Sequence, residues 1–334
     1  MTPPVRVAVD ALGGDRAPEE VVAGALEAAS PEIVPILHGP EGLGTGGLEL
    51  VVAPERIGMD EKPAEAVRAK PRSSLVAACR TVGEGRADAV VSAGNTGATL
   101  AAAMRELRRL PGVHRPAIAV TIPARRGPSL LIDGGANADA RPEHLLQFGH
   151  MGSIFAEEIL GAGNPDVRLL SIGEEDEKGN QLTLAAHELL AASDLRFGGN
   201  VESRELLAGA ADVVVTDGFT GNVCLKLLEG TIKTLLDALR EEITASQRGK
   251  LGGLLIRPAA NRLRRRLDPD TYGGAYLLGL RGLVVIAHGN SSRTAIANAI
   301  RLAARGVEHD LVGRLAERLS RRVESARSST GNVR

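Results

Sequence analysis

The sequence contains one strand-to-helix turn twice, and this repeat restricts the possible folds more than any other feature. The stretch ADAVVSAGNTG begins at Ala87, and ADVVVTDGFTG begins at Ala211. Each copy is typical of a buried strand that ends in a G-x-T-G corner and opens a helix. Such a corner directs backbone N–H groups and the positive end of a helix dipole at one point. Gly and Thr are also ordinary turn and cap residues, but two copies favour a cleft that binds an anion.

Apolar runs with strand character alternate with helical patterns along most of the chain. The alternation predicts a mainly parallel sheet covered by helices on both faces. The chain has four Phe, two Tyr and no Trp, so Val, Leu, Ile and Ala must fill the core, as is usual for buried parallel sheets. We therefore predict an α/β protein, a three-layer α/β/α sandwich formed by a single domain over residues 1–330. The predicted strands are Val5–Asp10, Ile33–Leu37, Leu48–Val52, Ala89–Ser92, Ala117–Ile122, Leu130–Asp133, Arg168–Ile172, Val213–Thr216 and Leu283–Ala287.

Nearly every predicted strand ends in a polar corner that contains glycine. In open α/β sheets, ligands bind outside the carboxyl ends of the strands. We therefore expect the corners to lie on one rim of the sheet and to share one anion site. The corners are Asp10–Asp15, Ser92–Gly97, Asp133–Asp139, Gly173–Asn180, Asp217–Asn222 and His288–Ser292.

A long helix is predicted from Val223 toward Ile243, after helices at Pro18–Ala29 and Pro142–Leu160. Its apolar stripe, formed by Leu228, Ile232, Leu235 and Leu239, extends past the last turn needed to cover the sheet. A second copy of the chain would bury this stripe, so the pattern predicts a homodimer.

The segment Arg248–Leu267 holds seven basic residues and no acid, with apolar residues at helical spacing. Pro258 is expected to split it into two short helices. Residues 240–270 thus form a predicted projecting, basic, amphipathic helical segment. Three interpretations stay open: contact with an anionic bilayer, packing on a partner subunit, and docking of an acidic protein.

Composition argues against several other classes of protein. The net charge of −1 gives no overall field that would attract nucleic acid or membrane. Cys79 and Cys224 form neither a disulfide framework nor a metal-ligand spacing, and the seven histidines contain no H-x-x-x-H pair. No stretch reaches transmembrane length, and the N-terminus has no leader-like run. We expect a cytoplasmic protein with no metal and no nucleic-acid partner.

The corner motifs resemble the bacterial fatty acyl-ACP:phosphate acyltransferases of phospholipid synthesis, the PlsX family. The resemblance runs from about Val5 to Ala304, and motifs of this number and length are highly specific. Small departures are Leu12 for Met, Gly134 for Val, and the basic segment with its proline. The matching stretches include VAVDALGGDRAPEEVVAGA at Val7, ADAVVSAGNTGA at Ala87, DGGANADARPEHLLQFGHMG at Asp133, NPDVRLLSIGEEDEKGN at Asn164 and GNVESRELLAGAADVVVTDGFTGNVCLK at Gly199.

The resemblance implies transfer of a fatty acyl group from acyl carrier protein to inorganic phosphate. The acyl phosphate formed would be used by a glycerol-3-phosphate acyltransferase. It further implies a fold like that of the isocitrate and isopropylmalate dehydrogenases, a homodimer, no cofactor, and reversible peripheral contact with anionic membrane. Three rival functions are a phosphotransacetylase that uses coenzyme A, a nicotinamide-dependent decarboxylating dehydrogenase, and a membrane scaffold without activity.

This chemistry suits the side chains at the corners. Phosphate is already a nucleophile and a thiolate of pKa about 8.5 leaves readily, so no Ser-His-Asp triad is needed. The reaction needs a phosphate cradle and oxyanion donors. We predict catalytic roles for Lys178, Asn222 and Asn95, while His288 either protonates the thiolate or caps its strand. The predicted substrate-binding residues are Asp10, Gly13, Gly14, Asp15, Gly94, Thr96, Gly97, Asp133, Asn137, Asn180, Asp217, Thr220 and Gly221, with the four aspartates orienting donors rather than acting as acids.

Overall fold

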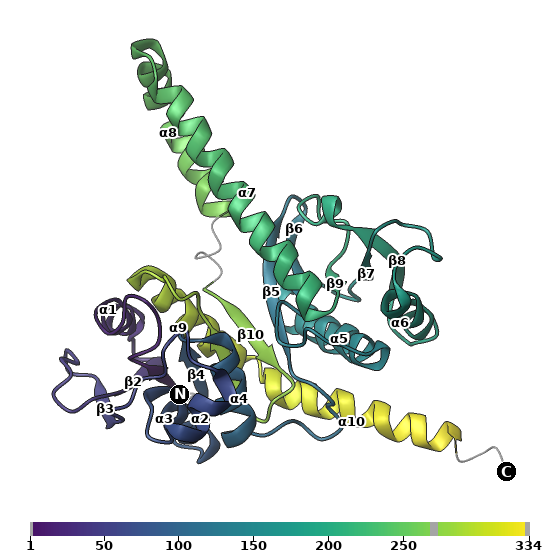
Figure 1. Ribbon diagram of the computed structural model, residues 1–334, viewed down its shortest axis with the longest axis horizontal. Helices are drawn as coiled ribbons and strands as arrows, with labels where there is room; N and C mark the ends of the chain where they lie inside the picture. Colours follow the sequence, from purple (N-terminus) through teal and green to yellow (C-terminus); the bar gives the residue numbers. More distant parts are fainter. Residues whose placement is uncertain (1–2, 268–272, 331–334) are drawn as a thin grey trace.

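One eleven-stranded mixed sheet runs through the computed structural model, which describes residues 3–267 and 273–330 (Figure 1). The strand order is β3-β2-β1-β4-β11-β10-β5-β6-β9-β7-β8. Every predicted strand is present, with bounds that move by at most a few residues. The strands are β1 (Val5–Asp10), β2 (Ile33–Gly39), β3 (Glu49–Val52), β4 (Ala89–Ser92), β5 (Ala117–Ala124), β6 (Gly127–Ile132), β7 (Val167–Ser171), β8 (Phe197–Glu202), β9 (Val213–Val215), β10 (Ala275–Leu278) and β11 (Leu283–Ile286).

The direction of the strands reverses in the middle of the sheet. β10, which was not predicted, pairs antiparallel with both β11 and β5, and β5 and β6 form an antiparallel hairpin. The carboxyl ends of β1, β4 and β11 therefore lie along one rim of the sheet, and those of β6, β9 and β7 lie along the opposite rim. Each of these two rims of strand ends is called an edge of the sheet below. The expectation that all six corners share one rim is wrong, because these reversals cannot be seen in the hydrophobic pattern of single strands.

Helices cover both faces of the sheet, as predicted for a three-layer α/β/α sandwich. The alternation of side chains in β1 shows the division, since Val7 and Val9 face one core and Ala8 faces another. Helices α1, α5, α6, α9 and α10 cover the first face, and α2, α3, α4 and α7 cover the second. The helices are α1 (Glu19–Ala28), α2 (Pro63–Ala69), α3 (Ser74–Gly83), α4 (Thr96–Glu106), α5 (Pro142–Phe155), α6 (Gln181–Ala191), α7 (Gly218–Thr244), α8 (Gln247–Leu267), α9 (Arg293–Glu308) and α10 (Leu311–Thr330), with a π-helical turn at Ala156–Leu160 and a 3-10 turn at Ser203–Glu205.

Helices α7 and α8 form a hairpin that projects away from the sheet (Figure 1). α7 begins at Gly218, earlier than the predicted Val223, because the Asp217 side chain caps it. α8 is one continuous helix with Pro258 inside, so the predicted division into two short helices is wrong. A proline removes one N–H but keeps a helical φ, and here the helix also packs against α7. Residues 268–270 of the predicted segment lie outside the described residues.

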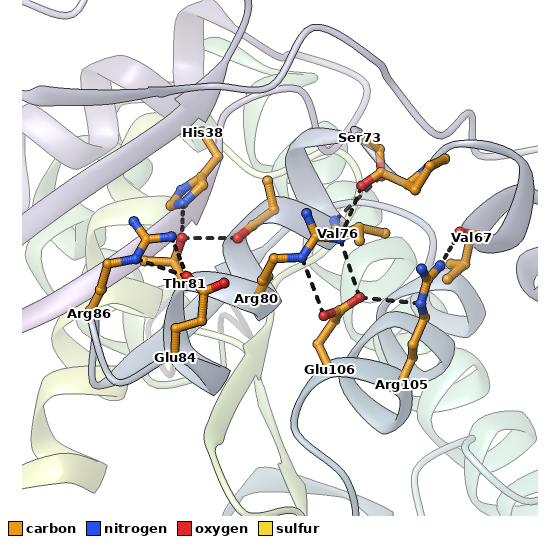
Figure 2. A network of polar contacts seen from close by, with 12 residues as sticks. His38, Val67, Ser73, Val76, Arg80, Thr81, Glu84, Arg86, Arg105 and Glu106 are labelled. Atoms are coloured by element: carbon orange, nitrogen blue, oxygen red, sulfur yellow. Dashed lines mark hydrogen bonds and ion pairs between the residues drawn. The ribbon is translucent and has the colours of Figure 1, made fainter.

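A network of polar contacts joins α2, α3 and α4 (Figure 2). Glu106 pairs with both Arg80 and Arg105, and the Arg105 guanidinium also donates to the Val67 carbonyl. At the other side of α3, His38 Nε2 lies 2.8 Å from Thr81 Oγ1, and burial lowers the pKa of His38 to about 4. This network fixes the helices whose first turns lie beside the candidate site.

Candidate functional site

The corner Asp10–Asp15, called the first corner below, is organised around the buried carboxylate of Asp10 at the end of β1. It accepts hydrogen bonds from Ser74 Oγ at 2.5 Å and Ser92 Oγ at 2.7 Å. Burial raises the pKa of Asp10, although these bonds act in the other direction. A Cβ on Gly13 would lie 2.4 Å from Asp10 Oδ2, so only glycine fits there. Asp10 therefore ties β1, α3 and β4 together, and the orienting role at the anion site stays a prediction.

Asp15, Asn95 and the β11 corner gather at the same edge. The Asp15 N–H donates to the Gly289 carbonyl at 2.7 Å, and Arg56 donates to the Gly14 carbonyl at 2.9 Å. Asn95 Oδ1 caps α4 by accepting from Ala98 N at 3.0 Å, and its Nδ2 donates to the Met59 carbonyl at 2.9 Å. Both ends of the Asn95 side chain are thus used within the protein. Gly94 lies between Ser92 and Asn95, and Thr96 and Gly97 form the first turn of α4.

The corner Asp133–Asp139, called the second corner below, is organised around Asp133, which is fully buried at the end of β6. Its carboxylate accepts five hydrogen bonds, from the N–H groups of Ile118, Gly135, Ala136 and Asn137 and from Asn137 Nδ2. The Asn137 carbonyl in turn accepts from Gly218 N at 2.8 Å. The Asp133 carboxylate therefore positions the first residue of α7.

The N-terminus of α7 meets the β6 corner closely. A Cβ on Gly221 would lie 2.0 Å from the Asp133 carbonyl oxygen. Asp217 Oδ1 accepts from Phe219 N and Thr220 N, both at 2.9 Å, and Gly221 N donates to the Asp217 carbonyl. These N–H groups all have acceptors within the protein. At this copy of the turn, donors for an external anion must therefore come from side chains further along α7.

A polar stripe on α7 meets the corner that follows β11. Asn222, Lys226 and Glu229 lie on one face of the helix, four and three residues apart. Glu229 Oε1 lies 3.5 Å from His288 Nε2, and Glu229 Oε2 lies 3.2 Å from Lys226 Nζ. α7 thus brings groups from opposite edges of the sheet together. Sequence reasoning missed Glu229 as a site residue, although its helical spacing from Asn222 could have indicated it.

The Lys178 loop follows β7, at the sheet edge opposite to that of His288. Lys178 N donates to the Glu175 carbonyl at 3.0 Å, and Ser171 Oγ donates to the Lys178 carbonyl at 2.9 Å. Asn180 caps α6 by accepting from Thr183 N at 2.9 Å. These bonds hold the loop on β7 and α6, and because β7 pairs in parallel with β9, the loop lies at the same edge of the sheet as the start of α7.

The junction offers amide and cationic donors, and its His288 follows β11, which pairs in parallel with the strand that leads into α4. Such donors are suited to holding an anion next to a polarised carbonyl. Within residues 3–267 and 273–330, no group of three or more His, Cys, Asp and Glu side chains has a metal-binding arrangement. Two surface hollows lie elsewhere, one of about 460 Å³ lined by Arg108 and Arg109 and one of about 230 Å³ lined by Arg72, Arg80 and Arg86.

Known proteins match the chain over nearly its whole length. The family model described as fatty acid synthesis protein matches residues 5–314. The phosphate acyltransferase of Heliobacterium modesticaldum is 46% identical over 332 residues, covering 96% of this chain and 99% of that protein. The phosphate acyltransferase of Desulfitobacterium hafniense (strain DSM 10664 / DCB-2) is 48% identical over 328 residues, covering 95% and 98%. A phosphotransacetylase from Streptococcus pyogenes has a similar structure, with TM-score 0.60, 18% identity, and 92% and 95% of the two chains covered. This last likeness shows the fold alone.

Proposed function

Since the chain belongs to the fatty acid synthesis protein family, we infer that it is an acyltransferase that moves a fatty acyl group from acyl carrier protein to inorganic phosphate. The product is an acyl phosphate for phospholipid synthesis, to be used by a glycerol-3-phosphate acyltransferase. The observation that carries the proposal is the junction at which α7, the helix that bears Asn222, Lys226 and Glu229, meets His288 after β11, the neighbour of β4.

The reaction needs donors and positioning more than it needs a protein nucleophile. Hydrogen phosphate would lie at the first turn of α4, where Thr96 and Gly97 start the helix and its dipole favours an anion. A phosphate oxygen attacks the thioester carbonyl carbon, and the developing oxyanion accepts hydrogen bonds from Asn222 and Lys178. The C–S bond then breaks, and the proton of hydrogen phosphate ends on the thiol, with His288 as the group placed to pass it on.

The roles of Asn222 and Lys178 are tested by separate alanine variants. Removal of a positioned donor to the transition state costs about tenfold or more in turnover. Acyl phosphate formed from acyl carrier protein thioester is trapped as hydroxamate, with and without phosphate. Asn261→Ala and Lys250→Ala change exposed residues of the same types on α8 and serve as matched controls. Rates equal to the unmodified chain in well-folded variants at both positions would remove these residues from the mechanism.

We propose that the chain works as a homodimer, with the α7 stripe in the interface. Leu235 and Leu239 are 68% and 51% exposed in the single chain, whereas isolated chains rarely leave such a row of leucines in water. Sedimentation at micromolar concentration should give the mass of two chains. A stable monomer at that concentration would contradict the proposal.

We also propose reversible contact between α8 and an anionic membrane by an otherwise cytoplasmic enzyme. No described helix is long and apolar enough to cross a bilayer. Leu251, Leu254 and Leu255 are exposed on α8 among its seven cations, each of which contributes about 1 kcal/mol near an anionic surface. The double change Leu254→Glu and Leu255→Glu should abolish flotation with anionic liposomes and leave soluble turnover unchanged. Loss of soluble turnover with flotation retained would assign α8 to a protein partner instead.

A further inference from the structure

A basic surface surrounds the hollow between the end of α4 and the start of β5. The hollow has a volume of about 460 Å³, and its lining includes Arg108 and Arg109. The sequence has no acidic residue between Glu106 and Asp133. We call the exposed and half-exposed arginines and histidines here the α4–β5 basic surface: Arg108, Arg109, His114, Arg115, Arg141, His144 and Arg281.

Contacts between these residues make the surface continuous. The Arg109 guanidinium donates to the His114 carbonyl, and Arg281 Nε donates to the Arg109 carbonyl at 3.1 Å. The rings of His114 and His144 lie edge to face with centroids 6.2 Å apart. Gln147 on α5 holds the loop by accepting from His114 N and donating to the Gly112 carbonyl. The basic residues therefore lie on a hydrogen-bonded loop and at the start of α5, and Arg281 is bonded to that loop.

The positive charges of this surface act on one of its own histidines, His144. The pKa of His144 is lowered, first by burial and then by the positive charges of Arg115, His114 and Arg141, with only Glu143 acting against them. Arginines on a rigid base form paired hydrogen bonds with carboxylates, so this surface suits an acidic protein partner.

The same surface borders the second corner of the candidate site. Arg115 precedes Pro116, whose carbonyl accepts from Asn137 Nδ2 at 2.8 Å. Asn137 also holds Gly218 at the start of α7, four residues before Asn222. A partner seated on the α4–β5 basic surface would thus stand beside Asn222. The basic helix α8 lies instead in the projecting hairpin (Figure 1), and only its last turn returns to the sheet, where Arg266 donates to the Ala124 and Arg125 carbonyls.

We propose that the α4–β5 basic surface docks the acidic carrier protein that presents the acyl thioester. This inference rests on the proposed function, and it assigns carrier docking to this surface rather than to α8. Because salt screens exposed charges, the docking interaction should weaken as salt rises. Reversal of these charges should act mainly on the rate of association.

The test compares two acyl donors in the full-length chain. Arg115→Glu with Arg141→Glu should raise the KM for acyl carrier protein thioester about tenfold at low salt, because the charges that steer association are reversed. The KM for butyryl-pantetheine, a neutral donor without the carrier protein, should not change. The matched controls are Arg115→Lys with Arg141→Lys, which keeps the charge, and Arg262→Glu with Arg264→Glu on α8.

Each other outcome has a separate meaning. An equal loss with both donors would show that the surface serves the chemistry and would overturn the docking assignment. An unchanged KM for the carrier thioester, or an equal rise in the α8 control, would also overturn it. Loss of liposome flotation with unchanged KM would assign the surface to membrane. If the unmodified chain forms acyl phosphate from neither donor, the proposed function itself fails.

Discussion

The change Asp133→Asn tests whether one buried carboxylate holds the second corner together. Asparagine has almost the same shape as aspartate, but it offers one oxygen and one NH₂ group where aspartate offers two oxygens. The three N–H groups at Oδ1, from Ile118, Gly135 and Ala136, would keep an acceptor. At Oδ2, Asn137 N at 2.7 Å and Asn137 Nδ2 at 2.8 Å would face a donor instead.

The size of the effect follows from the two bonds lost. A hydrogen bond to a charged group contributes about 1.5–3 kcal/mol, so Asp133→Asn should lower the free energy of unfolding by about 3–6 kcal/mol. That is a large part of the about 5–15 kcal/mol that stabilises an ordinary domain. Activity should fall as well, because Asn137 positions Gly218 and the start of α7.

Urea unfolding followed by circular dichroism measures this loss, with the exposed Asp139→Asn as the matched control. The double variant Asp133→Asn with Asn137→Ala removes one of the two opposed donors. It should therefore be less destabilised than the sum of the two single changes. A loss below about 1 kcal/mol for Asp133→Asn, or simple additivity in the double variant, would refute the reasoning.

Three further results are expected. Gly221→Ala should reduce both thermal stability and turnover, because its Cβ would lie 2.0 Å from the Asp133 carbonyl oxygen; a melting temperature equal to that of the unmodified chain would contradict this contact. Burial lowers the pKa of His38 from 6.5 to about 4, so as pH falls through this range the unfolded chain binds a proton that the folded chain does not bind. The free energy of unfolding should therefore drop by up to about 3 kcal/mol between pH 6.5 and 4. Urea unfolding of the parent and of His38→Gln checks this, since the variant should lack that share of the pH dependence. Burial raises the pKa of the Cys79 thiol, so iodoacetamide should label Cys79 only after unfolding, and mass spectrometry of peptides containing Cys79 and Cys224 should show slower labelling of Cys79.

The fold class followed from the sequence because its signals are local. Val213–Val215 and Ala89–Ser92 are apolar, β-branched or small, and bounded by polar corners, so each identifies a buried strand without its neighbours. The caps are equally local, although these residues were predicted from the sequence for the site and not for capping: Asn95, Asn180 and Asp217 each precede a helix and accept a hydrogen bond from its first turn. The motif resemblance identified the family for the same reason, because it depends on runs of adjacent residues.

The assembly of the site was decided by the tertiary structure. The antiparallel β10 and the β5–β6 hairpin reverse the sheet, and this depends on pairings between residues as distant as Tyr276 and Ala119. As a result the two copies of the turn lie on opposite edges, and only the length and direction of α7 bring Glu229 within 3.5 Å of His288. A local pattern fixes which residues start a helix and which face it buries, but long-range packing decides which corners that helix joins.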